Sequence, residues 1–187
     1  MVPLSGTFYR IVFEKYLDSA LNGVLSPEGR FHHDGEPAFY CSPTAQAASI
    51  AIDRYVGDND DARVLCKLTV TGEQVCDIRP PDHTPTLHRR DTDAKPTLKN
   101  AHIWAATPWF EDRQIGRTPA SWKASDAVRE TGADGMIYSS RRDPDRWHLV
   151  LFRWNDDGGP TVRIDTVTPW TQGVYYQSKN RVPDINT

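Results

Sequence analysis

The side chains best suited to chemistry gather in one short stretch, "GRFHHDGEPAFYCS" at 29–42. Arg30 follows a glycine, so a ligand could approach the backbone closely while the guanidinium fork holds a diphosphate. Tyr40 lies in an apolar segment, where its ring could line a pocket and stack on a flat, cationic heterocycle. Much later, Ser140 ends the segment "GMIYSS" and could supply a pocket hydroxyl. Each residue also has an ordinary structural explanation, as a surface arginine, a core tyrosine and a turn serine.

Six histidines raise the question of a metal site. His32 and His33 are adjacent, so in an extended segment they point to opposite sides, and the other four show neither an HExxH motif nor Cys/His ligand spacing. The phosphate loop GxxxxGK(S/T), the dinucleotide fingerprint GxGxxG and the hydrolase elbow GxSxG are absent from the sequence as well. We therefore expect no bound metal, and the corresponding enzyme classes lose their main support.

Charge and composition limit the partners. The 22 basic and 25 acidic residues give a net charge of -3, so no general basic field attracts nucleic acid or an anionic membrane. The three cysteines, Cys41, Cys66 and Cys76, are odd in number and lack CxxC pairing, which favours a reducing cytoplasm. No apolar run approaches the roughly 20 residues that span a bilayer. We expect a cytoplasmic protein that binds neither nucleic acid nor membrane.

The elements that must position these residues follow from periodicity. A chain of 187 residues can bury one good core, so we expect a single domain over 1–187 with its core at about 7–167. Alternation and β-branched or aromatic content predict strands at 7–13, 37–41, 62–70, 73–78, 134–140, 146–154 and 161–167. Helical spacing predicts helices at 43–56, 97–107 and 119–132, the first capped by Ser42 and the last ended by Gly132.

Two connections shape the expected fold. The tripeptide "TGE" at 71–73 is interpreted as the turn of a hairpin between two strands. Residues 79–96 are proline-rich, polar and aperiodic, which predicts a long loop that is a mobile flap, a partner-binding loop or disordered. Helices inserted between strands that mostly pair as neighbours, without regular βαβ alternation, indicate an α+β fold.

A family resemblance joins these scattered features. The frame of "YR" near the start, "GRF" with "PAFY" and an alanine-rich helix, and later "DGMIYSS" followed by "HLVLFRW", resembles the RES domain family, named for an arginine, a glutamate and a serine. The resemblance extends from Tyr9 to about Trp154. It implies a toxin of a bacterial toxin–antitoxin module, with a fold similar to ADP-ribosyltransferases of the diphtheria-toxin type: a mostly antiparallel, split sheet with flanking helices. The substrate that it implies is NAD+.

The resemblance also assigns roles by position. Arg30 matches the family's arginine, Tyr40 its pocket tyrosine and Ser140 its serine, which makes these three the expected catalytic residues. Arg10 matches the arginine of the first strand and is expected to help Arg30 hold the diphosphate. One of the two histidines of "FHH", His32 or His33, could hydrogen-bond the adenosine ribose or a phosphate, and the sequence does not choose between them.

One position departs from the family pattern. The family's glutamate would fall eleven residues after the tyrosine, where this chain has Ala51. The nearest acid is Asp53, but two residues along a helix correspond to about 200° of rotation, so its carboxylate should not point where Ala51 points. Because that acid usually stabilises the developing oxocarbenium ion, its absence argues against rapid hydrolysis of NAD+.

The resemblance therefore implies a mono-ADP-ribosyltransferase toxin that cleaves the nicotinamide–ribose bond of NAD+ and modifies a host protein. Two alternatives remain open: hydrolysis or phosphorolysis that depletes NAD+, and a catalytically inactive module that binds NAD+ or a protein. A cognate antitoxin that covers the pocket is the expected partner. The sequence identifies neither that antitoxin nor the protein acceptor.

Overall fold

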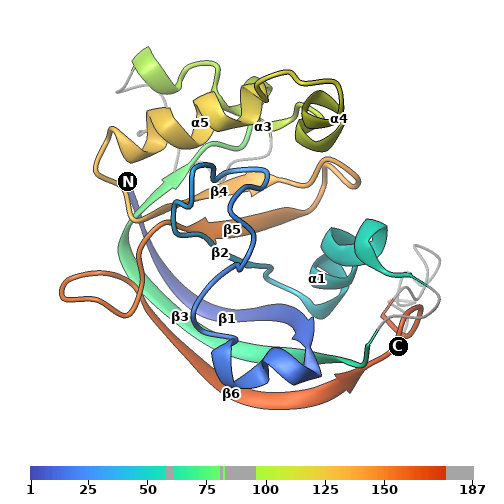
Figure 1. The fold of residues 1–187 in the computed structure, drawn as a ribbon. Helices are drawn as coiled ribbons and strands as arrows, with labels where there is room; N and C mark the ends of the chain where they lie inside the picture. The colour runs from blue at the N-terminus through green and yellow to red at the C-terminus, as the bar shows by residue number, and fades with distance from the viewer. Residues whose placement is uncertain (58–60, 81, 83–95, 176–187) are drawn as a thin grey trace, which may run out of the picture.

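The sheet of this protein is built from six strands in the part of the chain that the computed structural model describes, residues 1–57, 61–80, 82 and 96–175. The strands are β1 (Val2–Phe13), β2 (Phe39–Cys41), β3 (Arg63–Asp77), β4 (Gly135–Ser139), β5 (Trp147–Leu151) and β6 (Thr161–Trp170). The helices are α1 (Ala45–Ile52), α3 (Ala101–Ala105), α4 (Trp109–Gln114) and α5 (Ala120–Arg129), with 3-10 turns η1 (Glu14–Ser19), η2 (Asp53–Tyr55) and η4 (Pro96–Leu98). Figure 1 shows a curved layer of β1, β3 and β6 below β4 and β5, with α3, α4 and α5 above them.

The long strand β3 splits the sheet. Along one edge it pairs antiparallel with β1 over nearly its full length. Along the other edge it pairs antiparallel with β6 over 63–71, and then parallel with β4 over 75–77. The strand order β1-β3-β4-β5-β2 thus leaves β6 as a side branch on β3. The prediction of an α+β fold with a mostly antiparallel, split sheet is confirmed.

The predicted hairpin at 62–78 is wrong, because one continuous strand occupies this segment. Its pairing with β1 passes from Leu4↔Gly72 to Val2↔Val75, so β3 carries one extra residue at this point. This irregularity is a β-bulge, a usual position for a glycine inside a strand. A Cβ on Gly72 would also lie 3.0 Å from the ring of Pro160, so the glycine permits close packing rather than a turn.

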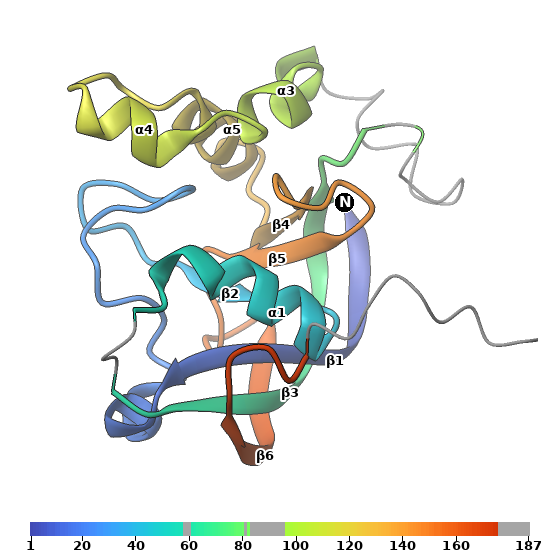
Figure 2. The same cartoon turned by 90° about the vertical axis from the view of Figure 1, so that its right-hand side faces the viewer.

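The strand order closes back on its first member. The last strand of the path, β2, returns to β1 through an isolated bridge between Tyr9 and Ser42, whose backbone groups exchange hydrogen bonds of 2.7 and 2.9 Å. In Figure 2, β2 passes behind α1, and β1 lies below both. The strands therefore nearly form a ring, and residues of β1 and β2 that are 33 positions apart in sequence become direct neighbours.

Helices cover only part of one sheet face. Successive strand residues point to opposite faces, so Tyr40, Tyr138 and His148 share a face with their neighbours two positions away. The apolar part of that face packs on α3 and α5 in a core cluster that includes Phe31, Ala101, Ala105, Ala124, Val128, Met136, Tyr138 and Val150. Beyond these helices, residues at the ends of β2, β4 and β5 line a cavity together with residues of α1.

The predicted helices differ from the observed ones mainly at their ends. Helix α1 begins at Ala45, because the hydroxyl of Thr44 accepts a hydrogen bond from the Ala47 amide and caps the helix. The predicted cap, Ser42, precedes the helix by three residues, and its hydroxyl contacts His148 instead. The segment 97–107 forms only η4 and the short α3. Gly132 adopts a φ of 78° just after α5, which supports its predicted role as a terminator.

The predicted loop at 79–96 lies almost wholly outside the described residues. Within the described ranges, the longest helix, α5, has ten residues, and none is long and apolar enough to cross a membrane.

Candidate active site

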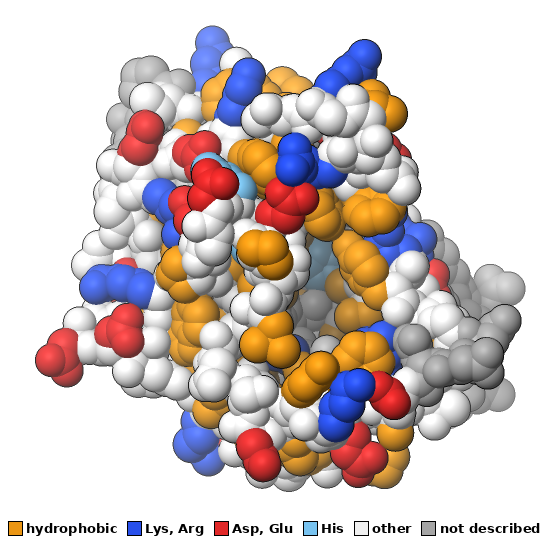
Figure 3. Space-filling model, viewed as in Figure 1, with side chains coloured by type: hydrophobic (Ala, Val, Ile, Leu, Met, Phe, Trp, Pro, Cys, Tyr) orange, Lys and Arg blue, Asp and Glu red, His pale blue; other side chains and the backbone are white. Residues whose placement is uncertain are grey.

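A cavity of about 400 Å³ lies between the ends of β2, β4 and β5 and helix α1. This size lies within the range of about 300–1,000 Å³ typical of small-molecule sites. Figure 3 shows the hollow on this side of the molecule, with hydrophobic side chains around it and histidine surface inside it. Among the described residues, its aromatic lining consists of Tyr9, Tyr40, Tyr55, Trp109 and Tyr138. Its charged lining consists of five arginines and one glutamate: Arg10, Arg30, Arg54, Arg141, Arg142 and Glu28.

The charged residues of the lining differ in whether they have a carboxylate partner, and Arg142 has one in Asp53 at 2.5 Å. Glu28 is already paired with Arg113 at 3.0 Å, and Arg54 and Arg141 share Glu111 at the mouth. Arg10 and Arg30 have no carboxylate partner within the described part of the chain, so their positive charge is not compensated inside the protein. An anionic group that carries oxygen acceptors, such as a diphosphate, would compensate it.

Arg30 lies at the border between the helices and the cavity. Its Nη2 donates to the carbonyl oxygen of Ala105 at the end of α3, at 2.5 Å, and its guanidinium lies 5.0 and 5.1 Å from the ring centres of Phe31 and Tyr138. Burial lowers the pKa of Arg30, as does the nearby charge of Arg141, whereas Tyr138 opposes this shift. The Nε atom is buried without a hydrogen-bond partner in the described residues, which is unfavourable by about 1–3 kcal/mol. A residue retained at such a cost suits a binding role better than a role in stability.

Gly29, His32 and Tyr40 interlock beside Arg30. Gly29 forms a bridge with His32, and a Cβ on Gly29 would lie 2.3 Å from Cε1 of the imidazole, so only glycine fits there. Nε2 of His32 donates to the carbonyl oxygen of Ser26 at 3.1 Å, which leaves Nδ1 to accept from the hydroxyl of Tyr40 at 3.0 Å. Burial lowers the pKa of His32 and keeps this ring neutral.

Tyr40 is fixed by its hydroxyl, while its ring lines the cavity. The hydroxyl also accepts from the Phe31 amide at 3.0 Å, so it holds both Phe31 and His32 in place. Burial raises the pKa of Tyr40 far above its usual value, so the hydroxyl remains protonated. The sequence predicted the ring as a stacking surface, and the hydroxyl's part in holding the loop is an addition from the structure.

Ser140 and Arg10 both line the cavity, as the resemblance implies. Ser140 is buried at the end of β4, where its hydroxyl accepts from the Asp143 amide at 3.3 Å. The guanidinium of Arg10 donates to the carbonyl oxygens of Gly23 and Tyr40 at 2.7 and 3.3 Å and stacks on Phe39. Burial lowers the pKa of Arg10 to about 10, so this side chain is still charged at neutral pH. Arg10 therefore fastens the cavity wall and adds positive charge behind it.

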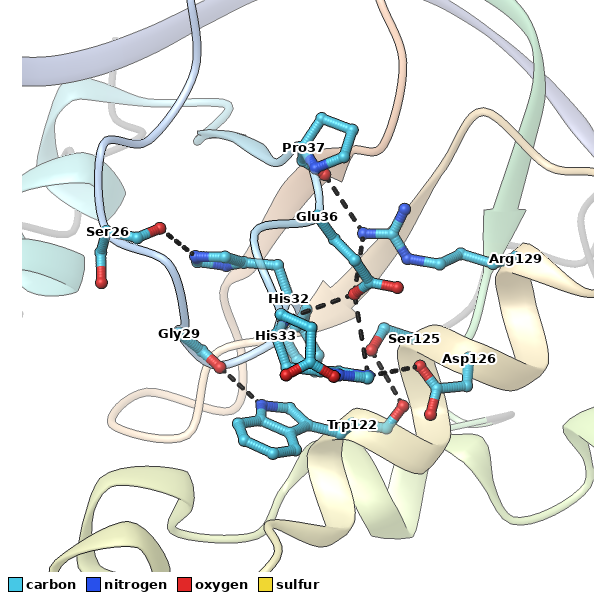
Figure 4. A network of polar contacts seen from close by, with 12 residues as sticks. Ser26, Gly29, His32, His33, Glu36, Pro37, Trp122, Ser125, Asp126 and Arg129 are labelled. Carbon is cyan, nitrogen blue, oxygen red and sulfur yellow. Dashed lines mark hydrogen bonds and ion pairs between the residues drawn. The ribbon is translucent and has the colours of Figure 1, made fainter.

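His33 does not line the cavity, in contrast to its neighbour. Figure 4 shows the two rings pointing apart, His32 toward Ser26 and His33 toward Asp126 on α5. Nε2 of His33 contacts the Asp126 carboxylate at 3.1 Å, Nδ1 contacts Asp34 at 3.0 Å, and the ring stacks on Trp122. Burial by itself would lower the pKa of His33, but the hydrogen bonds to Asp34 and Asp126 outweigh it and raise the pKa. Of the two candidates that the sequence left open, only His32 is at the site.

His33, Glu36 and Asp126 are also the group in the described residues that could hold a metal ion, with candidate ligand atoms within 4.8 Å of one another. Arg129 lies 3.6 Å from the Glu36 carboxylate and donates to the carbonyl oxygen of Pro37 (Figure 4). This guanidinium already supplies the positive charge that a cation would bring. We therefore interpret the cluster as the tie that holds the loop bearing Arg30 to α5.

Ala51 faces the cavity and Asp53 does not. Ala51 is part of the cavity lining, whereas the Asp53 carboxylate accepts from Nη1 of Arg142 at 2.5 Å in the 3-10 turn after α1. The Asp53 carboxylate is thus occupied by Arg142 in the structure, and the proposal that no acid replaces the family's glutamate at position 51 stays a prediction. Apart from Glu28, the described part of the cavity lining contains no carboxylate.

Sequence analysis missed two buried residues of the cavity, Ser42 and His148. Their side chains meet at 2.8 Å between Oγ and Nδ1, although 106 positions separate them. Alternation along the strands could have indicated both residues. Ser42 follows Tyr40 by two positions and so lies on the same face, and His148 is paired with Tyr138 across the β4–β5 ladder. The sequence could not show that β2 and β5 are adjacent, which is what joins them.

Comparisons with known proteins agree with this arrangement. No curated protein matches the sequence. A solved structure described as the M. tuberculosis MbcT–MbcA toxin–antitoxin complex contains a chain with a similar fold, at a TM-score of 0.54 and 18% identity, covering 93% of this chain and 88% of that one. The family model described as the RES domain matches residues 7–173, a range that includes every strand from β2 to β6 and every cavity residue named above. The chain belongs to the RES domain family.

Proposed function

We propose that this protein is the toxin of a toxin–antitoxin module and that it acts on NAD+. The observation that carries the proposal is the cavity in which Arg10 and Arg30 lie, with no carboxylate partner among the described residues, beside several aromatic rings. NAD+ combines the two groups that such a lining fits, an anionic diphosphate and a flat cationic ring. Membership of the RES domain family supports the same reaction class, and the neighbour of similar fold comes from a toxin–antitoxin complex.

In the proposed mechanism the protein positions the substrate and stabilises charge. The bond between the nicotinamide nitrogen and its ribose carbon breaks, and the electron pair stays on the nitrogen, which becomes neutral. Positive charge develops on the sugar as in glycoside cleavage, so the diphosphate must lie close to it. Arg30 binds the diphosphate, with Arg10 adding charge from behind. The ring of Tyr40 stacks on nicotinamide, and Ser140 hydrogen-bonds the ribose or the amide.

The acceptor decides which product forms. Its nucleophilic atom forms the new bond to the ribose carbon, and its proton passes to solvent. With Ala51 where the family has a glutamate, the cavity lacks the carboxylate that would assist a water molecule. A protein side chain docked over the mouth is held at high effective concentration and excludes water. We therefore favour transfer of ADP-ribose to a host protein over hydrolysis, and we propose that a cognate antitoxin inhibits the enzyme by covering this mouth.

Incubation of the purified protein with adenylate-labelled NAD+ and a cell extract tests the proposal. Label on a protein supports transfer, free ADP-ribose indicates hydrolysis, and ADP-ribose phosphate formed in phosphate buffer indicates phosphorolysis. The Arg30→Ala variant is the control and should give none of these products. If the wild-type protein neither cleaves nor binds NAD+, the proposed function is wrong; binding without cleavage would identify a module that only recognises the dinucleotide.

A further inference from the structure

His148 is a buried polar residue at the cavity that the mechanism above does not use. It lies on β5 opposite Tyr138, is 4% exposed, and shares the sheet face of Tyr40 and Ser140. The ring of Tyr138 flanks it, with the ring centres 5.5 Å apart. His148 therefore lies beside aromatic rings of the cavity lining, where the proposed mechanism places nicotinamide.

Ser42 fixes the orientation of the His148 ring. Its Oγ lies 2.8 Å from Nδ1, and its backbone belongs to the bridge with Tyr9 that closes the ring of strands. Ser42 is 3% exposed, and within the described ranges its hydroxyl has no partner other than His148. A buried hydroxyl donates wherever an acceptor is available, so the Ser42 hydroxyl donates its hydrogen bond to Nδ1, which accepts it.

This bond determines what His148 presents to the cavity. When Nδ1 of a neutral imidazole accepts, the ring proton is on Nε2. No hydrogen bond joins Nε2 to any described residue, and the side chain lines the cavity. Burial, together with the charges of Arg30 and Arg146, lowers the pKa of His148 to about 3, so the ring remains neutral and keeps this tautomer at physiological pH.

The chemistry of this donor differs from that of the arginines. A guanidinium is charged and prefers phosphate or carboxylate oxygens. A neutral, oriented N–H beside aromatic rings suits a neutral carbonyl oxygen, whose recognition needs direction more than charge. The proposed substrate carries one such group next to its cationic ring, the carboxamide.

We propose that His148, oriented by Ser42, donates a hydrogen bond from Nε2 to the carboxamide oxygen of nicotinamide and so selects the substrate's base. This inference rests on the proposed function. His148 is a substrate-contacting residue, and Ser42 is a positioning residue that acts through it. The carboxamide is attached to the nicotinamide ring. A hydrogen bond to its oxygen therefore also holds the ring in place while the bond between nicotinamide and ribose breaks.

Two substitutions at His148 separate the donor from the Ser42 bond. His148→Asn keeps an amide near the Nδ1 position but has no group at the Nε2 position, and His148→Gln extends an amide to the Nε2 position. We expect His148→Asn to raise KM for NAD+ by about 5- to 100-fold, the range for one hydrogen bond lost at a buried partner. His148→Gln should recover most of this loss, and Ser42→Ala should show an intermediate one. A wild-type KM in His148→Asn would overturn the inference.

A substrate analogue identifies the atom that is contacted. A dinucleotide in which nicotinamide is replaced by unsubstituted pyridine lacks the carbonyl, so His148→Asn and the wild-type protein should bind it equally well. An undiminished effect of His148→Asn on this analogue would overturn the assignment to the carboxamide.

Nitrogen NMR of the wild-type imidazole avoids any dependence on variants that fold poorly. In the free protein, Nε2 should carry the proton and Nδ1 should not. Addition of carba-NAD+, which is not cleaved, should shift the Nε2–H proton downfield. The opposite tautomer, or an unchanged Nε2–H resonance at saturation with this ligand, would overturn the inference while leaving cleavage of NAD+ intact. Absence of both cleavage and binding by the wild-type protein would instead overturn the proposed function and, with it, this contact.

Discussion

Replacement of Gly29 by alanine is the change whose consequence the structure determines most closely. The backbone of Gly29 is not in the left-handed region, so alanine adds no backbone strain. Its Cβ would, however, lie 2.3 Å from Cε1 and 2.9 Å from Nδ1 of His32. The ring must therefore leave its place and lose its bonds to Tyr40 and Ser26. Two lost neutral hydrogen bonds of about 0.5–1.5 kcal/mol each, and an unsatisfied tyrosine hydroxyl, outweigh a gain of about 0.4–1 kcal/mol from the stiffer unfolded chain. We expect the free energy of unfolding to fall by about 2 kcal/mol.

A double-mutant cycle tests this reasoning by chemical denaturation. In a His32→Ala background the obstructing ring is gone, so Gly29→Ala should be neutral or stabilise by about 0.4–1 kcal/mol. Gly6→Ala is the matched control, since its Cβ would meet only an ordinary contact at 3.9 Å with the ring of Phe8. Equal destabilisation by Gly29→Ala in both backgrounds would refute the explanation.

Three further predictions concern the site, and a fourth concerns His33 beside it. Arg30→Ala should lower kcat/KM for nicotinamide release by about 30- to 1,000-fold with the fold intact, and Arg30→Lys should recover only part; near wild-type turnover in Arg30→Ala would contradict the clamp. Tyr40→Phe should retain most NAD+ affinity in titration but lower the free energy of unfolding, whereas Tyr40→Ala should lose affinity; equal affinity losses would point to the hydroxyl. Ala51→Glu should raise hydrolysis relative to protein labelling at little cost in stability, because Ala51 is exposed, and Asp53→Asn should stay active; unchanged partitioning with an inactive Asp53→Asn would contradict this. The pKa of His33 is raised in the folded state, so its contribution to the free energy of unfolding is complete below the unfolded pKa of about 6.5 and is lost as pH rises through the folded pKa. Between pH 6 and 8, the free energy of unfolding should therefore fall more steeply in the wild-type protein than in His33→Gln.

The fold was predictable where local pattern decides it. Alternation located the strands, and the absence of a βαβ rhythm gave the fold class. The mistakes came from glycine and serine, whose roles depend on distant partners. Gly72 indicates a turn only until β1 and Pro160 pack against it, and Ser42 is a plausible helix cap only until His148 becomes its partner.

The site was predictable in its family residues and not in its electrostatics. Arg30, Tyr40 and Ser140 do line one cavity, as does Ala51, whereas the Asp53 carboxylate pairs with Arg142. Which of two adjacent histidines enters the cavity depends on α5, because Asp126 binds His33 and leaves His32 facing inward. The local sequence cannot show which histidine faces the cavity, because the residue that binds His33 lies more than 90 positions away in the chain.

The closing of the strand ring has a consequence for synthesis in the cell. Among the described strands, β2 pairs in a ladder only with β5, and the Ser42–His148 bond spans 106 positions. A chain that is still emerging from the ribosome therefore has no complete cavity until β5 has been made, although Arg10, Arg30 and Tyr40 appear early. Domains fold as units when their last pairing segments become available. If the finished protein consumes NAD+, we expect the producing cell to be exposed to this activity only after β5 has been translated, and a chain truncated before β5 to lack the activity.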